Sequence, residues 1–264
     1  MAVTLAAIPG MRSVYGGAAR RWLWIPLLML FVWPTAWGGQ AEFLQAIKNR
    51  DAEAIGANLV GAGDVNVAIK DGRTALMVAA KHGDGELVRR LVKAGADVNQ
   101  RNQNGGTPLM YASIEGNIKT IEYLVTQGAE VNATAKLGWS ALMIAASKGH
   151  SAAVTTLLEA GANPNTSDVY GWTPLIRAAY QGKRAAVAAL LASPATVIDA
   201  QDDRGATALH HAAARGYPRI VDLLVAHGAR LEAADTEGRT ALFKAKTNGH
   251  RGIERMLEDA ISRL

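Results

Sequence analysis

The chain repeats one pattern of residues six times at a nearly constant interval. Each copy contains a Gly-x-Thr-x-Leu element, with Ser in place of Thr once, and successive copies are 33 residues apart except for one interval of 34. The leucines of this element are Leu76, Leu109, Leu142, Leu175, Leu209 and Leu242. Because such self-similarity is typical of proteins built from stacked supersecondary units, the chain is predicted to form a solenoid.

Local signals place a short first helix in each copy. The Thr or Ser of the element has a side chain that suits a helix N-cap, where its oxygen accepts a backbone N–H. Pro108 and Pro174 follow two of these residues, at a helical position that needs no N–H donor. A glycine further on suits the left-handed end of the helix. These glycines are Gly83, Gly116, Gly149, Gly182, Gly216 and Gly249.

A longer second helix follows, with its apolar residues on one face. In the first full copy, the pairs Leu87-Val88 and Leu91-Val92 recur every four residues and form one stripe. Gly95 then ends the helix, and a polar segment leads to the next copy. A single copy cannot bury its stripe, so we expect stability to come from the contacts between neighbouring copies.

This pattern resembles the ankyrin repeat, which has the same period and a Thr-Pro-Leu-His-x-Ala signature. The best-matching copy is GATALHHAAARGYPRIVDLLVAHGA at residues 205–229. The resemblance implies an all-α solenoid in which each repeat has a β-hairpin finger and two antiparallel helices, stacked in a curved array. The predicted domain, residues 39–264, divides into units at about 40–69 (N-terminal cap), 70–102, 103–135, 136–168, 169–202, 203–235 and 236–264 (C-terminal cap).

Three features depart from the family pattern. The signature histidine is present only at His210, so the inter-turn hydrogen bond that it makes in the family is expected only there. The segment LLASPATVIDAQDD has one extra residue, and Ser193-Pro194 replaces the expected glycine, which predicts an altered loop. Lys244 and Lys246 stand where apolar or small residues are expected, and we interpret the last unit as a solvent-facing cap.

Residues 1–38 are predicted to be a signal peptide. Arg20-Arg21 precedes an apolar run of 12 residues, Trp22 to Trp33, whereas a membrane-spanning helix needs about 20. Small residues at Ala36 and Gly38 predict cleavage after Gly38. An uncleaved membrane anchor and a buried apolar helix are the alternatives. Translation from Met11 instead of Met1 would shorten the leader.

The leader favours a periplasmic or secreted protein of a bacterial cell. If the leader is not cleaved, the domain would be anchored in the inner membrane and would face the periplasm. Contact with a membrane is expected only in that second case.

The composition argues against several functions. The net charge is +5, but the leader contains three arginines and no acidic residue, which leaves 25 basic and 23 acidic residues in the domain. This balance does not support nucleic-acid binding. No cysteine is present, and no catalytic motif, metal-ligand pattern or cofactor motif occurs. We therefore expect no enzyme activity, no metal, no cofactor and no small-molecule substrate.

The resemblance implies that function lies at positions that vary between repeats, at the finger tips and at the end of the first helix. In the central repeats these positions predict a protein-binding surface made of Leu137, Trp139, Lys148, Tyr170, Trp172 and Tyr180. The two tryptophans occupy the same position in adjacent repeats and are expected to lie side by side. They either bind a partner, since Trp and Tyr dominate interface hot spots, or pack across the neighbouring finger.

A second group of variable positions is basic. Arg204, Arg215 and Arg239 lie toward the C-terminal end and favour an acidic partner, or else they are solvated tips without a binding role. The sequence thus predicts a protein-interaction module or scaffold. The alternative is a membrane-anchored assembly factor that stabilises an envelope complex or a periplasmic enzyme.

Overall fold

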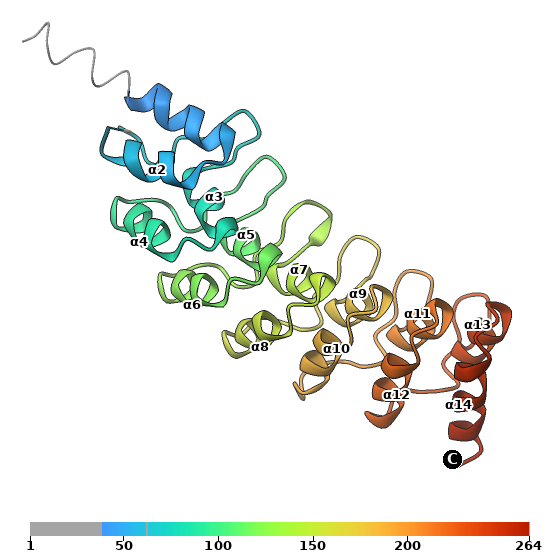
Figure 1. The fold of residues 1–264 in the computed structure, drawn as a ribbon. Coiled ribbons are helices and arrows are strands. Elements are labelled where there is room, and N and C mark those ends of the chain that lie inside the picture. Colours follow the sequence, from blue (N-terminus) through green and yellow to red (C-terminus); the bar gives the residue numbers. More distant parts are fainter. Residues whose placement is uncertain (1–38, 62, 264) are drawn as a thin grey trace, which may run out of the picture.

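The computed structural model describes residues 39–61 and 63–263, and it shows two rows of helices stacked along the chain (Figure 1). The first row consists of α3 (Ala75–His82), α5 (Pro108–Glu115), α7 (Ala141–Lys148), α9 (Pro174–Tyr180), α11 (Ala208–Arg215) and α13 (Ala241–Thr247). The second row consists of α4 (Gly85–Lys93), α6 (Ile118–Thr126), α8 (Ser151–Glu159), α10 (Arg184–Leu191), α12 (Pro218–Ala226) and α14 (Arg251–Ile261). The predicted all-α repeat solenoid is confirmed. The predicted signal peptide lies outside the described residues.

The first unit of the stack is also a pair of helices. One helix extends over residues 39–49, and α2 (Ala52–Asn58) follows it and continues into the 3-10 helix η1 (Leu59–Gly61). Each helix in the described part of the chain is too short or too polar to cross a membrane.

Loops that we call fingers connect each second helix to the first helix of the next repeat, and they project along one side of the stack (Figure 1). In the described residues the predicted β-hairpins are reduced to isolated β-bridges, such as that between Thr134 and Ser140. Backbone hydrogen bonds join successive fingers; for example, Val169 N–H donates to the Leu137 carbonyl over 3.1 Å. We call the surface formed by the fingers and the first helices the finger–helix face.

The predicted helix caps are confirmed. Ser140 Oγ accepts the Met143 N–H over 3.2 Å, and the threonines at the same position do the same in four other repeats. Gly116 ends α5 with φ of 71°, the left-handed conformation that costs glycine little. Both ends of the first helix are therefore set by local chemistry.

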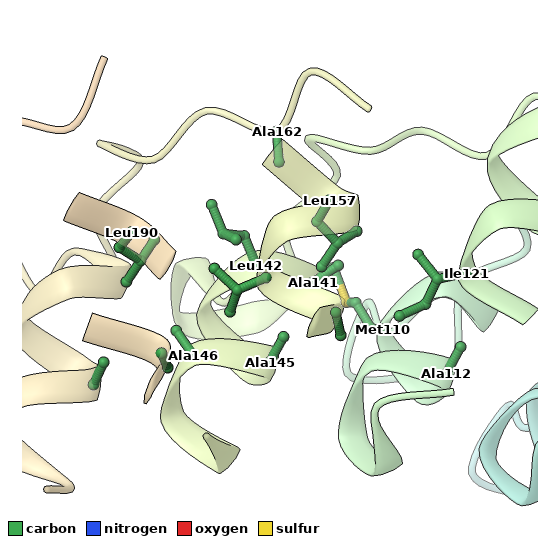
Figure 2. Packing of buried hydrophobic residues seen from close by; sticks show 14 of the residues in the cluster. Met110, Ala112, Ile121, Ala141, Leu142, Ala145, Ala146, Leu157, Ala162 and Leu190 are labelled. Carbon is green, nitrogen blue, oxygen red and sulfur yellow. The ribbon is translucent and has the colours of Figure 1, made fainter. Parts of the chain in front are cut away.

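The apolar core is continuous through the stack because each repeat contributes to the core of both neighbours. Leu142 and Leu157 of one repeat lie between Ile121 of the preceding repeat and Leu190 of the following one, and all four are fully buried (Figure 2). Burying one such side chain contributes about 2 kcal/mol. Alanines on the first helices, such as Ala145, are also fully buried and allow neighbouring helices to approach closely.

A ladder of asparagines joins the ends of successive second helices. Asn132 donates from Nδ2 to the Gly161 carbonyl over 3.0 Å, and its Oδ1 accepts the Asn163 N–H over 2.8 Å. Asn66, Asn99 and Asn165 make equivalent pairs of hydrogen bonds to the next repeat. These side chains fix the register between repeats on the side of the second helices.

The altered loop predicted after α10 is confirmed. Ala192 follows the helix in a right-handed conformation, and Thr196 Oγ1 donates to the Leu190 carbonyl over 2.6 Å. The loop accommodates the extra residue before Ala195. The Ala195 carbonyl accepts a hydrogen bond from Asn165 Nδ2 over 2.7 Å. The asparagine ladder therefore continues past the insertion.

Replacing Asn132 with Ala should lower the free energy of unfolding by about 1–2 kcal/mol, because two exposed hydrogen bonds to the backbone of the next repeat are lost. The matched control is Asn104→Ala at an exposed finger tip, where we expect a change below about 0.5 kcal/mol. Urea unfolding followed by circular dichroism measures both. Equal effects of the two substitutions would contradict a structural role for the ladder.

Candidate functional site

A buried carboxylate lies at the base of three successive fingers. The three residues are Asp168, Asp202 and Asp235, whose side chains are almost inaccessible to solvent. In the first of these fingers, Asp168 Oδ1 accepts the N–H of Tyr170 over 2.9 Å and that of Trp172 over 3.0 Å. The other two carboxylates accept the N–H groups two and four residues further on in the same way. Each carboxylate thereby fixes the shape of its finger.

The second oxygen of each carboxylate binds a cationic or imidazole side chain nine residues further along, on the first helix of the same repeat. Asp168 pairs with Arg177, whose Nε lies at 2.9 Å; Asp202 accepts from His211 Nε2 over 2.8 Å; Asp235 pairs with Lys244 Nζ at 2.8 Å. In earlier repeats the same two positions hold Asn102 with Tyr111, Ile69 with Val78, and Ala135 with Ile144. In every repeat the two positions are therefore of one kind: both are apolar, both are polar, or an aspartate faces a basic side chain.

The Lys244–Asp235 pair corrects one interpretation of the sequence. Lys244 does not simply face solvent in a terminal cap, because its side chain neutralises a buried carboxylate. Burial raises the pKa of Asp235, but the hydrogen bonds from Lys244 and Arg239 outweigh it and hold that pKa well below its usual range. The second unexpected lysine, Lys246, is exposed and lies 3.6 Å from Glu254.

Arg177 also connects the two predicted tryptophans. Its guanidinium carbon lies 4.4 Å from the ring centroid of Trp139 and 4.5 Å from that of Trp172, so one cation lies between the two indoles. Cation–π contacts of this kind contribute about 0.5–2 kcal/mol, depending on burial. The tryptophans are half-buried, and they hold the cation that neutralises Asp168.

The stack of rings continues toward the C-terminal repeats. The Trp172 ring lies 4.7 Å from His211 and 4.8 Å from Tyr180, centroid to centroid. Arg215 lies over the ring of Tyr180, with its guanidinium carbon 4.3 Å from the ring centroid. Aromatic and cationic side chains thus form an unbroken series across three repeats of the finger–helix face.

The six predicted site residues fall into three groups. Trp139, Trp172 and Tyr180 are half-buried members of the stack. Leu137 and Tyr170 are exposed on adjacent finger tips, at 55% and 56% of their full accessibility. The third group is Lys148 alone, which is exposed at the end of α7 and does not take part in the ring contacts found in the described residues.

Leu137 is also strained. Its φ is 66°, in the left-handed region, within the 3-10 helix η2 (Lys136–Gly138). In this finger Ala135 stands where the two neighbouring fingers have Asn102 and Asp168, and alanine has no side-chain oxygen to accept the backbone N–H groups. A bulky side chain in this region costs about 1–2 kcal/mol.

Sequence reasoning missed Arg177 and His211. Both are central to the stack, and both lie nine residues after a finger-base aspartate. The repeated spacing from Asp168, Asp202 and Asp235 was the available signal. This signal is weak because an aspartate occupies the finger base in only three of the repeats.

The structure explains the adjacent histidines of α11 without a metal. His210 Nε2 donates to the Arg239 carbonyl over 3.0 Å, which confirms the inter-turn hydrogen bond expected at this position alone. Burial lowers the pKa of His210 and of His211 from the ordinary value of 6.5, so both are neutral at pH 7. In the described part of the chain, no group of three potential ligands is arranged to hold a metal ion.

A shallow groove of about 280 Å³ opens beside the stack, between the finger that contains Tyr170 and the next one. Trp172 and His211 form part of its lining, and Arg204 lies at its edge. The groove combines aromatic surface with hydrogen-bonding groups, a mixture that suits a side chain or a short segment of a partner.

Repeated finger–helix–helix units with a variable face define a repeat solenoid. Family comparison matches ankyrin repeats in three segments, residues 43–135, 132–202 and 195–262. Since these segments cover most of its length, the chain belongs to the ankyrin-repeat family. Proteins of this family are typically non-enzymatic modules that mediate protein–protein interaction. The comparison with curated proteins finds no match.

The Asp168–Arg177 pair can be tested with a replacement that the chain itself contains. Arg177→Ile should lower the free energy of unfolding by about 3–5 kcal/mol, because a buried carboxylate loses its partner. The double variant D168A/R177I copies Ala135 and Ile144 of the preceding repeat and should lose less. Both variants lose the cation between the indoles. The double variant also loses the two backbone hydrogen bonds to Asp168, but it leaves no unpaired buried charge. A double variant no more stable than the single one would contradict this account.

Stability should fall as the pH drops below about 6.5, because the pKa values of His210 and His211 are lowered in the folded state. The unfolded chain then binds more protons than the folded one, and the loss ends below the folded pKa values. Urea unfolding at pH 7.5 and 5.5 measures the difference. His210→Met, which copies Met143 of another repeat, should reduce it. An unchanged pH dependence in this variant would exclude His210 as a cause.

Proposed function

We propose that this protein is an exported interaction module that holds a protein partner on the finger–helix face of its central repeats. The leader described above supports export to the periplasm or the medium, with cleavage after Gly38. With an uncleaved leader, the same face would hold its partner beside the inner membrane, as an assembly factor. Both versions require the same binding surface.

The observation that carries the proposal is the combination of strain and exposure at Leu137. A left-handed leucine destabilises the backbone, and an apolar side chain that is 55% exposed recovers little by burial. Asparagine or glycine would suit both the backbone and the solvent better. Strained residues cluster at functional sites, and a partner that covers this side chain would account for it.

Two more exposed apolar side chains accompany it. Val169 and Tyr170 are 55% and 56% exposed on the next finger, which is hydrogen-bonded to Leu137. We call these three residues the finger-tip patch. Fingers on either side carry polar tips, Asn104 and Arg204. The patch is therefore an apolar interruption in a polar edge, as expected at the centre of a protein interface.

The substitution Leu137→Asn should separate binding from stability. Asparagine tolerates the left-handed conformation, so the free energy of unfolding should stay the same or rise by about 1 kcal/mol. The partner would be identified by co-purification with the wild-type protein from native cells, purified, and titrated against each variant. We expect its affinity for Leu137→Asn to fall at least about tenfold, as for loss of an interface anchor.

The matched control is Val60→Asn, which removes a 96% exposed apolar side chain from the N-terminal cap. Its affinity for the partner should match that of the wild type. Wild-type affinity in Leu137→Asn would contradict the proposed surface. A loss of stability that accompanies the loss of affinity would instead assign Leu137 to the fold.

A further inference from the structure

We infer that the partner is recognised through an acidic segment that carries an apolar side chain between two carboxylates. This inference rests on the proposed function and specifies the chemistry of the partner. The site consists of six residues at the junction of two repeats, which we call the aromatic cradle: Tyr170, Trp172, Tyr180, Arg204, His211 and Arg215.

The floor of the cradle is aromatic and partly buried. The rings of Trp172, Tyr180 and His211 are in mutual contact, with centroid distances of 4.7 to 5.7 Å. They come from a finger and from the helices α9 and α11, so the floor is supported by three elements. The groove beside them provides space for one apolar side chain to lie against the rings.

A guanidinium lies at each end of this floor. Arg215 is stacked on Tyr180 at the end of α11, and Arg204 lines the groove at the finger tip. In the described residues, no ion pair involves either of these arginines, whereas Arg239 pairs with Asp235 and Glu237. Stacking on Tyr180 also restrains the guanidinium of Arg215, which lowers the entropy cost of binding an anion.

The carboxylates near the cradle do not cancel these charges. Asp202 accepts hydrogen bonds from His211 and from two backbone N–H groups, so few of its lone pairs remain for a partner. Asp203 lines the groove and is exposed, which leaves two arginines against one exposed carboxylate. Toward the N-terminal end of the same face, by contrast, Arg73 pairs with Asp71 and Lys81 with Glu115. The cradle thus has the charge that complements an acidic segment.

The structure thereby separates the three arginines that the sequence grouped together. Arg239 forms ion pairs within its own finger, whereas Arg204 and Arg215 form no ion pair among the described residues and border aromatic surface. A segment that spans both would place a carboxylate at each end and an apolar residue on Trp172. A basic segment would meet like charges at both ends.

Selection from a phage-displayed library of random dodecapeptides against the purified protein tests this inference. Wild-type protein should enrich peptides with Asp or Glu on both sides of an aromatic or aliphatic residue. An enriched peptide would then be synthesised with a fluorophore and titrated by fluorescence anisotropy. The double variant R204A/R215A should bind it at least tenfold more weakly, and added NaCl should weaken the wild-type complex more than the variant complex.

The matched control is R184A/R219A, which removes two exposed arginines from the second helices α10 and α12. It should bind the peptide as the wild type does, and circular dichroism should show the same fold for all three proteins. Enriched peptides without acidic residues, no enriched peptide, or equal affinity for R204A/R215A would overturn the inference. The proposed function is tested separately, by the affinity of the native partner for the Leu137→Asn variant.

Discussion

Each helix pair of this protein can bury its apolar stripe only against the pairs before and after it. The leucines of one repeat touch side chains of both neighbours, as Leu142 and Leu157 do (Figure 2). The close packing of neighbouring repeats therefore constrains the rest of the stack. It requires small residues such as Ala145 on the first helices, and it brings equivalent positions of successive repeats into contact. Side chains at the same position of successive repeats therefore form a row along the surface of the stack.

Two of these rows differ in how freely they vary. The asparagine ladder and the hydroxyl caps make the same hydrogen bonds in repeat after repeat, because they satisfy backbone groups whose positions do not change. The finger-base position and its partner nine residues later vary together, since the pair must be apolar, hydrogen-bonded or mutually neutralised. Ala135 with Ile144 and Asp168 with Arg177 are two solutions in adjacent repeats. The charged solution places a cation between Trp139 and Trp172.

The features without a structural benefit are the ones assigned to binding. Leu137 combines a strained backbone with an exposed apolar side chain, and Arg204 and Arg215 carry charges that the described part of the chain does not neutralise. Natural sequences agree with their folds at most positions and depart from them at functional sites. The departures here lie on one face, in two repeats separated by a single repeat, so a single partner can contact all of them.

The sequence alone determined the period, the helix ends, the order of the helices and the altered loop near Ser193, because these depend on capping and on apolar spacing within one repeat. It also indicated the positions where Trp139, Trp172 and Tyr180 meet. Only the tertiary structure decided which of the candidate residues are buried and which cations are occupied. Arg177 and Lys244 neutralise carboxylates nine residues away, and His211 donates a hydrogen bond to the third. These contacts depend on how each finger folds back over its helix. The sequence shows the charges, but burial and distance decide whether they stabilise the fold or remain available to a partner.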